Sequence, residues 1–290
     1  MSLCALPAWF KQEIPDALTL ERRKYVSGYR VNTVCVQARC PNESVCLKAK
    51  KLTFLILGPA CTRHCGFCAV EKNKTDRLTV DGEEPLRISQ LVTRLELRYV
   101  VLTSVARDDL SDCGAAHFAK TIEAIYRGNP EVVVEALIPD FLGYTWCLEA
   151  VAAARPAVVA HNIEIVPRLY GQLRPEAGYG RSLGVLQELK HIDRTIFTKS
   201  SLMVGLGETE EEVVQVMQDL RVASCDIFTI GQYLAPSVLH YPVKEFVPPE
   251  QFRCYQRKAY ELGFKAVLAG PLVRSSYRAE EVYREMLCTM

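Results

Sequence analysis

Six cysteines form two closely spaced groups in the first quarter of the chain. The second group has the spacing C-x3-C-x2-C and consists of Cys61, Cys65 and Cys68. Three thiolates this close together can bind three irons of a cubane cluster and leave the fourth iron without a protein ligand. A small chelating molecule can bind at such an open position, which is what catalysis requires. The spacing therefore predicts a catalytic 4Fe-4S cluster.

The first group has the spacing C-x4-C-x5-C and consists of Cys35, Cys40 and Cys46. We expect it to bind a second 4Fe-4S cluster, because each group is one ligand short of four. The alternatives are that its thiols are structural, or that all six cysteines serve one site. A zinc site with His64 as the fourth ligand is the alternative for the second group, but the paired C-x2-C units usual in zinc fingers are missing.

The other six cysteines are scattered along the chain, and we expect each of them to be either a small buried hydrophobic residue or an incidental thiol on the surface. They are Cys4, Cys113, Cys147, Cys225, Cys254 and Cys288.

The composition is that of an ordinary globular chain of 290 residues, with 49% hydrophobic and 24% charged residues, which excludes a disordered or collagenous protein. The net charge of +1 gives no reason to expect a nucleic acid or an anionic membrane as a partner. The first thirty residues lack the pattern of an export signal, and no apolar segment approaches the roughly 20 residues that cross a bilayer. We therefore expect a cytoplasmic protein, in which thiols stay reduced and clustered cysteines usually bind metal.

Apolar runs rich in branched residues alternate with segments of helical spacing. The predicted strands are Leu52–Leu57, Tyr99–Thr103, Val132–Leu137, Val158–Ile163, Thr195–Val204 and Asp226–Ile230. The predicted helices are Ile88–Leu97, His117–Tyr126, Tyr144–Ala154, Arg181–His191 and Thr209–Arg221. Strand-then-helix repeats of this length indicate βαβ units and a parallel sheet covered by helices. The fold class that we expect is α/β, a partial (β/α)6 TIM-like barrel, and a doubly wound open sheet is the competing architecture.

We expect three regions in the chain. Residues 1–50 form an irregular N-terminal extension that carries the first cysteine group. Residues 51–246 form the barrel, and residues 247–290 form a C-terminal extension with a helix at Glu250–Leu262, followed by the apolar run Ala266–Gly270. Chemistry in such a fold lies at the carboxyl ends of the strands, and the second cysteine group directly follows the first strand.

The second cysteine group, with Phe67 directly before its last cysteine, resembles the signature of the radical S-adenosylmethionine (SAM) superfamily. The resemblance implies that SAM chelates the open iron of the cluster and that Phe67 belongs to the SAM site. It further implies that cleavage of SAM gives methionine and a 5′-deoxyadenosyl radical, which abstracts hydrogen from an unactivated C–H bond. The cofactor carries that step, so the protein has to position and shield it.

Eight phrases are similar to the pattern of the lipoyl synthase family, and they cover nearly the whole chain: residues 38–42, 61–63, 103–110, 137–141, 161–164, 204–208, 231–237 and 274–277. The resemblance implies that two SAM molecules are spent to abstract hydrogens from C6 and C8 of an octanoyl chain on a protein lysine. The auxiliary cluster then gives two sulfides, and a lipoyl group results. Two departures from the pattern are Cys113, where the family often has glycine, and Leu47, where tryptophan is common.

The same resemblance implies a serine as the fourth ligand of the auxiliary cluster, from the Arg-Ser-Ser-Tyr element at 274–277. We assign this ligand to Ser276, with Ser275 as the less favoured neighbour and a hydrogen-bonding serine in a turn as the alternative. An alkoxide is harder than a thiolate and less well matched to iron, which suits a cluster that is dismantled.

Polar residues at the strand ends have donors or acceptors suited to SAM. The candidates are Thr103, Ser104, Asn162, Glu164 and Lys199, together with Arg174, which would steer the SAM carboxylate. For Thr103, Ser104 and Lys199 the alternative is a capping or ion-pair role, and for Arg174 it is an exposed arginine on a βα loop. Gly205–Glu208 is expected either to cradle an anion, as the family stretch beside the SAM adenine would, or to pack tightly before a helix capped by Thr209 and Glu212.

The implied substrates are octanoylated lipoyl-carrier domains, those of the E2 component of 2-oxoacid dehydrogenases and the glycine cleavage H protein. Reduced ferredoxin or flavodoxin is the implied electron donor. The rival functions are another radical SAM sulfur-insertion enzyme, a two-cluster electron carrier and a zinc-stabilised scaffold. An electron carrier is disfavoured because it needs four ligands for each cluster.

Overall fold

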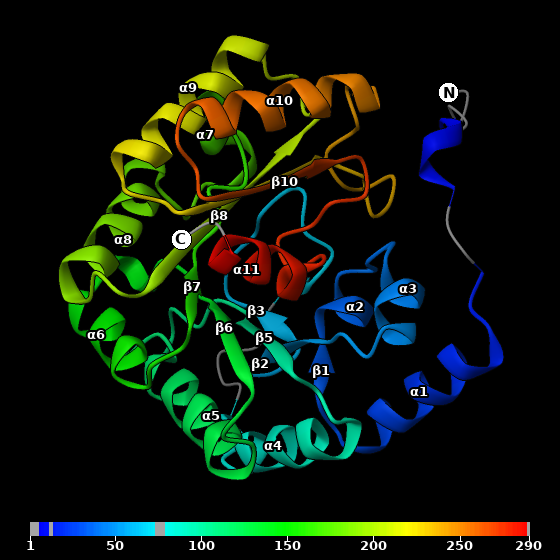
Figure 1. The fold of residues 1–290 in the computed structure, drawn as a ribbon, viewed down its shortest axis with the longest axis vertical. Helices are drawn as coiled ribbons and strands as arrows, with labels where there is room; N and C mark the ends of the chain where they lie inside the picture. The colour runs from blue at the N-terminus through cyan, green and yellow to red at the C-terminus, as the bar shows by residue number, and fades with distance from the viewer. Residues whose placement is uncertain (1–5, 12–13, 73–78, 289–290) are drawn as a thin grey trace.

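The structure is a computed structural model that describes residues 6–11, 14–72 and 79–288. Its main feature is an eight-stranded sheet in the order β1-β2-β5-β6-β7-β8-β9-β10. The strands from β2 to β10 are parallel, and β1 runs antiparallel to β2 at one edge. Helices surround the sheet on its outer side (Figure 1). The order of the strands in the sheet is their order in the chain, without the reversal of a doubly wound sheet. The expected partial barrel is therefore confirmed, and the doubly wound alternative is wrong.

The strands of the main sheet are β1 (Asn32–Thr33), β2 (Thr53–Ile56), β5 (Tyr99–Ser104), β6 (Val133–Leu137), β7 (Val158–Ala160), β8 (Phe197–Val204), β9 (Ile227–Gln232) and β10 (Ala266–Gly270). A small parallel pair, β3 (Ala60–Cys61) and β4 (Glu71–Lys72), follows β2. The helices are α1 (Ala17–Gly28), α2 (Val34–Gln37), α3 (Glu43–Lys48), α4 (Glu84–Leu95), α5 (Ala115–Gly128), α6 (Thr145–Ala153), α7 (Tyr170–Leu173), α8 (Tyr179–Ile192), α9 (Glu210–Val222), α10 (Pro249–Glu261) and α11 (Ala279–Cys288). Short 3-10 helices lie at Ala8–Phe10, Phe141–Gly143 and Pro167–Leu169.

The predicted strands and helices of the barrel are confirmed, with ends that shift by a few residues. The strand predicted at Val158–Ile163 ends at Ala160, and the polar phrase after it turns at the carboxyl end of the sheet. The apolar run Ala266–Gly270 pairs with β9 as a seventh parallel strand. Thr209 and Glu212 form the predicted capping box at the start of α9.

The expectation of an irregular N-terminal extension is wrong, because its described residues form three α-helices and a short 3-10 helix. Asp16 caps α1 by accepting hydrogen bonds from the backbone N–H and the hydroxyl of Thr19, at 2.8 and 2.7 Å. α1 buries only Thr19 and Val26, so it lacks the apolar periodicity that reveals a helix in a sequence. α2 and α3 have only 4 and 6 residues, which is too short for such a period.

The C-terminal helix α11, which the sequence did not predict, closes the amino end of the barrel. Val282 and Met286 pack against residues at the amino ends of β7, β9 and β10. The ring of Tyr283 contacts the rings of Tyr99 and Phe197, with centroids 5.8 and 6.1 Å apart. Figure 1 shows α11 in the middle of the ring of strands and helices. Among the described residues, no helix is long and apolar enough to span a membrane.

Segment 271–278 connects β10 to α11 and passes close to β9. A Cβ atom at Gly231 of β9 would lie 2.0 Å from the carbonyl oxygen of Val273, so only glycine leaves room for the segment. The side-chain amide of Asn42 donates to the carbonyl oxygen of Leu272 at 2.6 Å. The two extensions therefore meet at this segment.

Candidate active site

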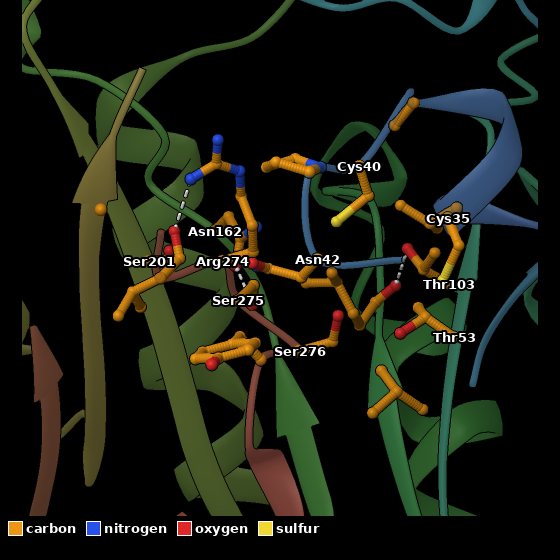
Figure 2. A pocket seen from close by; sticks show the side chains of 18 of the residues that line it. Cys35, Cys40, Asn42, Thr53, Thr103, Asn162, Ser201, Arg274, Ser275 and Ser276 are labelled. Atoms are coloured by element: carbon orange, nitrogen blue, oxygen red, sulfur yellow. Dashed lines mark hydrogen bonds between the residues drawn. The ribbon is translucent and has the colours of Figure 1, made fainter. Parts of the chain in front are cut away.

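One cavity of about 480 Å³ brings both extensions and the barrel strands together. Potential metal ligands from three parts of the chain line it: Cys35, Cys40, Cys46, Cys68 and Ser276. Figure 2 shows Cys35, Cys40 and Ser276 around the same space, with Arg274 and Ser275 beside them. Cys61 and Cys65 are not among the residues that line the cavity. The structure thus brings the first cysteine group and the Arg-Ser-Ser-Tyr element together, and the second group adjoins them through its last cysteine.

The first cysteine group is held by short helices and turns. The backbone N–H of Cys40 donates to the carbonyl oxygen of Cys35 at 3.0 Å, and that of Lys51 donates to the carbonyl oxygen of Cys46 at 2.8 Å. Burial raises the pKa of the Cys35 and Cys46 thiols to about 12, so a metal that binds here has to displace their protons. The Arg274 guanidinium lies near Cys40 and brings positive charge to this wall.

The eleven cysteines that the structure describes are all free thiols. Within the described part of the chain, no three His, Cys, Asp or Glu side chains converge closely enough to hold one metal ion. A cubane cluster does not require such convergence, because each thiolate binds a different iron. Free cysteines in groups of three around a cavity therefore fit clusters with separate iron corners.

The loop of the second cysteine group is anchored to the end of β5. The Cys61 sulfur accepts hydrogen bonds from the backbone N–H groups of Arg63 and Ala106, at 3.4 and 3.3 Å. The backbone N–H of Thr62 also donates to the carbonyl oxygen of Ala106, at 3.1 Å. These bonds fix the first cysteine of the group at the carboxyl end of the sheet.

Arg63 is buried and binds two carboxylates below this loop. Its guanidinium donates to Asp108 at 2.7 and 2.9 Å and to Asp140 at 2.5 Å. Burial alone would raise the pKa of Asp140, but the hydrogen bond and charge of Arg63 outweigh this and lower it to about 2. All three residues lie within segments that are similar to the lipoyl synthase pattern, but their types and positions predict no role for them. Their pairing joins residues 45 and 77 positions apart, which no local pattern reveals.

The predicted strand-end residues Asn162 and Glu164 both line the cavity and are joined by a hydrogen bond of 3.0 Å. The Ser275 hydroxyl donates to the side-chain oxygen of Asn162 at 2.9 Å, which connects the C-terminal segment to the end of β7 (Figure 2). Burial raises the pKa of Glu164, and the nearby Arg174 partly offsets this. Glu164 has a φ of +67°, a left-handed conformation that is rare for a residue other than glycine.

Arg174 is buried, so the alternative of an exposed arginine is wrong. Its guanidinium donates to the carbonyl oxygen of Asn162 at 3.3 Å and to the Tyr170 hydroxyl at 3.1 Å. It does not line the cavity and instead lies behind the strand-end residues. Lys199 is also away from the wall, because it is 1% exposed and pairs with Glu135 at 2.7 Å.

Thr103, Ser104 and Phe67 all line the cavity. The Thr103 hydroxyl is used by the fold, since it donates to the carbonyl oxygen of Leu137 at 2.9 Å. The Ser104 hydroxyl is buried and has no hydrogen-bond partner among the described residues. A buried polar atom without a partner is unfavourable, so a ligand that bonds to Ser104 would stabilise this wall.

The Gly205–Glu208 loop packs tightly before α9. The carboxylate of Glu208 accepts hydrogen bonds from the backbone N–H groups of Gly205 and Leu206. The donors that would cradle an anion are therefore taken by the loop's own side chain. The structure supports the packing interpretation of this stretch.

The family profile described as "Radical SAM superfamily" matches residues 55–220. A protein named "Lipoyl synthase" from Caldanaerobacter subterraneus subsp. tengcongensis is 51% identical over 274 residues, which cover 94% of this chain and 95% of the relative. A second protein of that name, from Thermus thermophilus, is 52% identical and covers 96% and 87% of the two chains.

Solved structures are similar in fold at low identity. The FeFe-hydrogenase maturase HydG from Carboxydothermus hydrogenoformans matches with a TM-score of 0.61 and 12% identity, over 80% of this chain and 56% of that one. Methylornithine synthase matches with a TM-score of 0.51 and 12% identity, over 81% and 80%. At this identity the likeness concerns the fold alone.

Proposed function

Because this chain belongs to the radical SAM superfamily and, within it, to the lipoyl synthase family, we propose that its two cysteine groups divide one reaction between them. The chain is a sulfurtransferase that uses SAM and two 4Fe-4S clusters to insert sulfur at C6 and C8 of a protein-bound octanoyl group. When bound, these groups supply a 5′-deoxyadenosyl radical and two sulfides. The second cysteine group holds the cluster that binds SAM, and the first group holds the cluster that gives up sulfur. The observation that carries this assignment is that Cys40 and Cys68, one from each group, line the same cavity.

The SAM site lies between the second cysteine group and the ends of β5 and β7. Asn162 and Glu164 present polar atoms there, and the unpaired Ser104 hydroxyl is free to bond to SAM. Phe67 offers an apolar surface beside Cys68. Arg174 acts as a positioning residue, because it holds the Asn162 carbonyl oxygen from behind the wall. Lys199 has no part in this site, since its ammonium is paired with Glu135.

The octanoyl chain lies between the two cysteine groups. The cavity wall there is largely apolar and includes Val34, Leu52, Leu55, Val101, Leu137 and Leu202. Each CH₂ group of an aliphatic chain that is buried against such a wall contributes about 0.8 kcal/mol of favourable free energy. A chain of eight carbons therefore needs no charged partner to bind. The same wall excludes water from the radical, which would otherwise react elsewhere.

Ser276 is the fourth ligand of the sulfur-giving cluster. It lines the cavity with all three cysteines of the first group. Its neighbour Ser275 is occupied by the hydrogen bond to Asn162, which leaves Ser276 as the serine available to iron. This arrangement favours Ser276 over Ser275 on a ground that the sequence alone did not contain.

The substrates are octanoylated lipoyl-carrier domains, those of 2-oxoacid dehydrogenase E2 components and of the glycine cleavage H protein. Reduced ferredoxin or flavodoxin supplies the electrons. The compartment is the cytoplasm, where the free thiols of the described cysteines stay reduced. Within this function, residues 1–50 and 247–290 act as extensions that complete a site begun by the barrel of residues 51–246.

The assignment of the two groups is tested by Cys40→Ala and Cys65→Ala in anaerobically reconstituted protein. Cys40→Ala should cleave SAM but form no lipoyl product from an octanoyl-lysine peptide, while Cys65→Ala should lose SAM cleavage. The matched control is Cys254→Ala on α10, which should keep about eight irons per chain and both activities. The reverse pattern in the first two variants would show that the roles of the groups are exchanged.

The serine assignment is tested by Ser276→Ala and Ser275→Ala. Ser276→Ala should lose lipoyl formation and change the absorption and Mössbauer signals of one cluster, while SAM cleavage continues. Ser275→Ala should retain that cluster's signals and show weaker SAM binding through Asn162. Unchanged cluster spectra in Ser276→Ala would reject the ligand.

A further inference from the structure

The loop after β9 presents two apolar side chains to solvent at the edge of the cavity. Val238 is 93% exposed and Leu239 is 92% exposed, the highest values among the large hydrophobic residues described. Leu234, Ala235 and Pro236, earlier in the same loop, line the cavity. Val238 follows Pro236 by two residues, so their Cα atoms are at most about 8 Å apart. We call Val238 and Leu239 the apolar tip.

The apolar tip is held in place from both sides. The imidazole of His240 is hydrogen-bonded to the Ser237 hydroxyl at 2.9 Å and donates to the carbonyl oxygen of Cys68 at 3.2 Å. The backbone N–H of Tyr241 donates to the carbonyl oxygen of Gly66 at 3.0 Å. These bonds attach the loop to the second cysteine group.

The same loop is attached to the first cysteine group through Arg39, whose guanidinium donates to the carbonyl oxygen of Pro236 at 3.4 Å. The backbone N–H of Leu239 donates to the Ser237 hydroxyl at 3.3 Å, which shapes the turn itself. A loop fixed to both cysteine loops positions its exposed side chains in advance, and such preorganisation lowers the entropy cost of binding a partner.

The substrate is an octanoyl chain on a lysine of a carrier protein, and its geometry says where that protein must lie. An extended octanoyl-lysine arm measures roughly 15 Å from the carrier backbone to the end of the acyl chain. With the chain inside the cavity, the carrier surface is therefore close to the cavity rim. The apolar tip lies at that rim, and among the described residues no apolar side chain covers it, since Val238 and Leu239 are almost fully exposed.

We propose that Val238 and Leu239 form a docking contact for the carrier protein that bears the octanoyl-lysine, which binds over the mouth of the cavity. This inference rests on the proposed function and adds to it the surface that recognises the folded carrier. The proposal requires the carrier to present apolar surface near its modified lysine, so that binding covers the tip. A second copy of this chain would be the other occupant, and the test below separates the two.

The test compares a folded carrier with a short peptide in anaerobically reconstituted protein. The probes are an octanoylated H protein and an octanoyl-lysine peptide taken from around its modified lysine. The variant is the double substitution Val238→Ser/Leu239→Ser. The matched control is Val222→Ser, a 77% exposed valine at the end of α9 that does not line the cavity.

The double variant should bind the H protein about 10-fold more weakly than the unchanged chain. It should bind and convert the peptide as the unchanged chain does, because the peptide lacks the carrier surface, and Val222→Ser should match the unchanged chain with both probes. Equal weakening with both probes, or no weakening with either, would overturn the inference. So would a dimer of the unchanged chain that the double substitution dissociates. Failure of the unchanged chain to convert either probe would instead overturn the proposed function on which the inference rests.

Discussion

At the scale of single residues, Arg63 lies within the second cysteine group and connects its loop to two carboxylates. Its guanidinium binds Asp108 with two hydrogen bonds and reaches Asp140, which is fully buried. Lysine keeps the charge but cannot bond two carboxylates in this planar way. Arg63→Lys should therefore lower the free energy of unfolding by about 3 kcal/mol and loosen the loop of the second cysteine group.

The comparison for Arg63→Lys is Arg168→Lys, which alters an exposed pair with Glu212 of the same two-bond geometry. Exposed pairs contribute little, so this variant should lose less than about 1 kcal/mol. Urea unfolding under anaerobic conditions gives both values, and iron content reports the cluster. Equal losses in the two variants would mean that the buried network does not stabilise the loop.

His161 predicts a pH dependence of stability. It is buried, with Nδ1 2.9 Å from the carbonyl oxygen of Ile138 and Nε2 3.0 Å from the Ser182 hydroxyl. Burial lowers its pKa to about 4 from the ordinary 6.5. Above pH 6.5 the side chain is neutral in both states. As the pH falls from 6.5 to 4, only the unfolded chain takes up the proton. The free energy of unfolding therefore falls by up to about 3 kcal/mol, and this decrease is complete below pH 4.

The measurement is the free energy of unfolding at pH 7 and pH 5 for the unchanged chain and for His161→Gln. The unchanged chain should lose about 2 kcal/mol more over this interval than the variant does. His191→Gln, at an exposed histidine on α8, serves as the control and should follow the unchanged chain. A variant that shows the full pH dependence would assign the effect to other groups.

At the scale of elements, the sequence predicted what local patterns encode and missed what distant residues form together. The barrel strands are confirmed because branched apolar runs mark buried parallel strands. Cys35 was predicted from the spacing of the cysteines and Asn162 from its place at the end of a strand, and both line the cavity. The contact between Asn42 and Leu272, 230 positions apart, has no local signal. The helix α11, in contrast, does carry a local signal, because its buried residues Ala279, Val282 and Met286 have helical spacing, and this spacing could have predicted it.

Substitution of Gly231 tests how strand β9 positions segment 271–278. Gly231→Ala would place a methyl group 2.0 Å from the carbonyl oxygen of Val273, so segment 271–278 has to move. That segment carries Ser276, and its displacement should abolish lipoyl formation while SAM cleavage continues. Stability should fall by about 1–3 kcal/mol, the usual cost of overpacking.

The control for Gly231→Ala is Gly184→Ala within α8, where a Cβ atom would meet nothing within 4 Å. This variant should gain about 0.5–1 kcal/mol, because alanine favours the helix, and should keep full activity. Product yield and SAM cleavage are measured on the same anaerobic sample. Loss of both activities in Gly231→Ala would indicate general unfolding and not a local displacement.

At the scale of the whole molecule, the cavity of about 480 Å³ is lined by parts of the chain that lie at opposite ends of the sequence. The N-terminal extension supplies the first cysteine group, the barrel supplies the second, and the C-terminal extension supplies the Arg-Ser-Ser-Tyr element. Lys51 and Glu281 form an ion pair that connects α11 to the start of the barrel. The position of Ser276 therefore depends on both β10 and α11, between which its segment is suspended.

Substitution of Met286 tests whether α11 keeps segment 271–278, which carries Ser276, in place. Met286 is fully buried against the amino ends of the strands, and Met286→Ala should cost about 2–5 kcal/mol through lost packing and a cavity. Because α11 anchors one end of segment 271–278, the cluster that we assign to the first cysteine group and Ser276 should be lost at lower urea concentrations than the cluster that we assign to the second group. The next residue gives the matched control, since Leu287 is half exposed and Leu287→Ala should cost less than about 1 kcal/mol. Iron content and SAM cleavage along the urea series measure the two clusters separately, and simultaneous loss of both would show that α11 stabilises the barrel as a whole without a specific effect on the Ser276 segment.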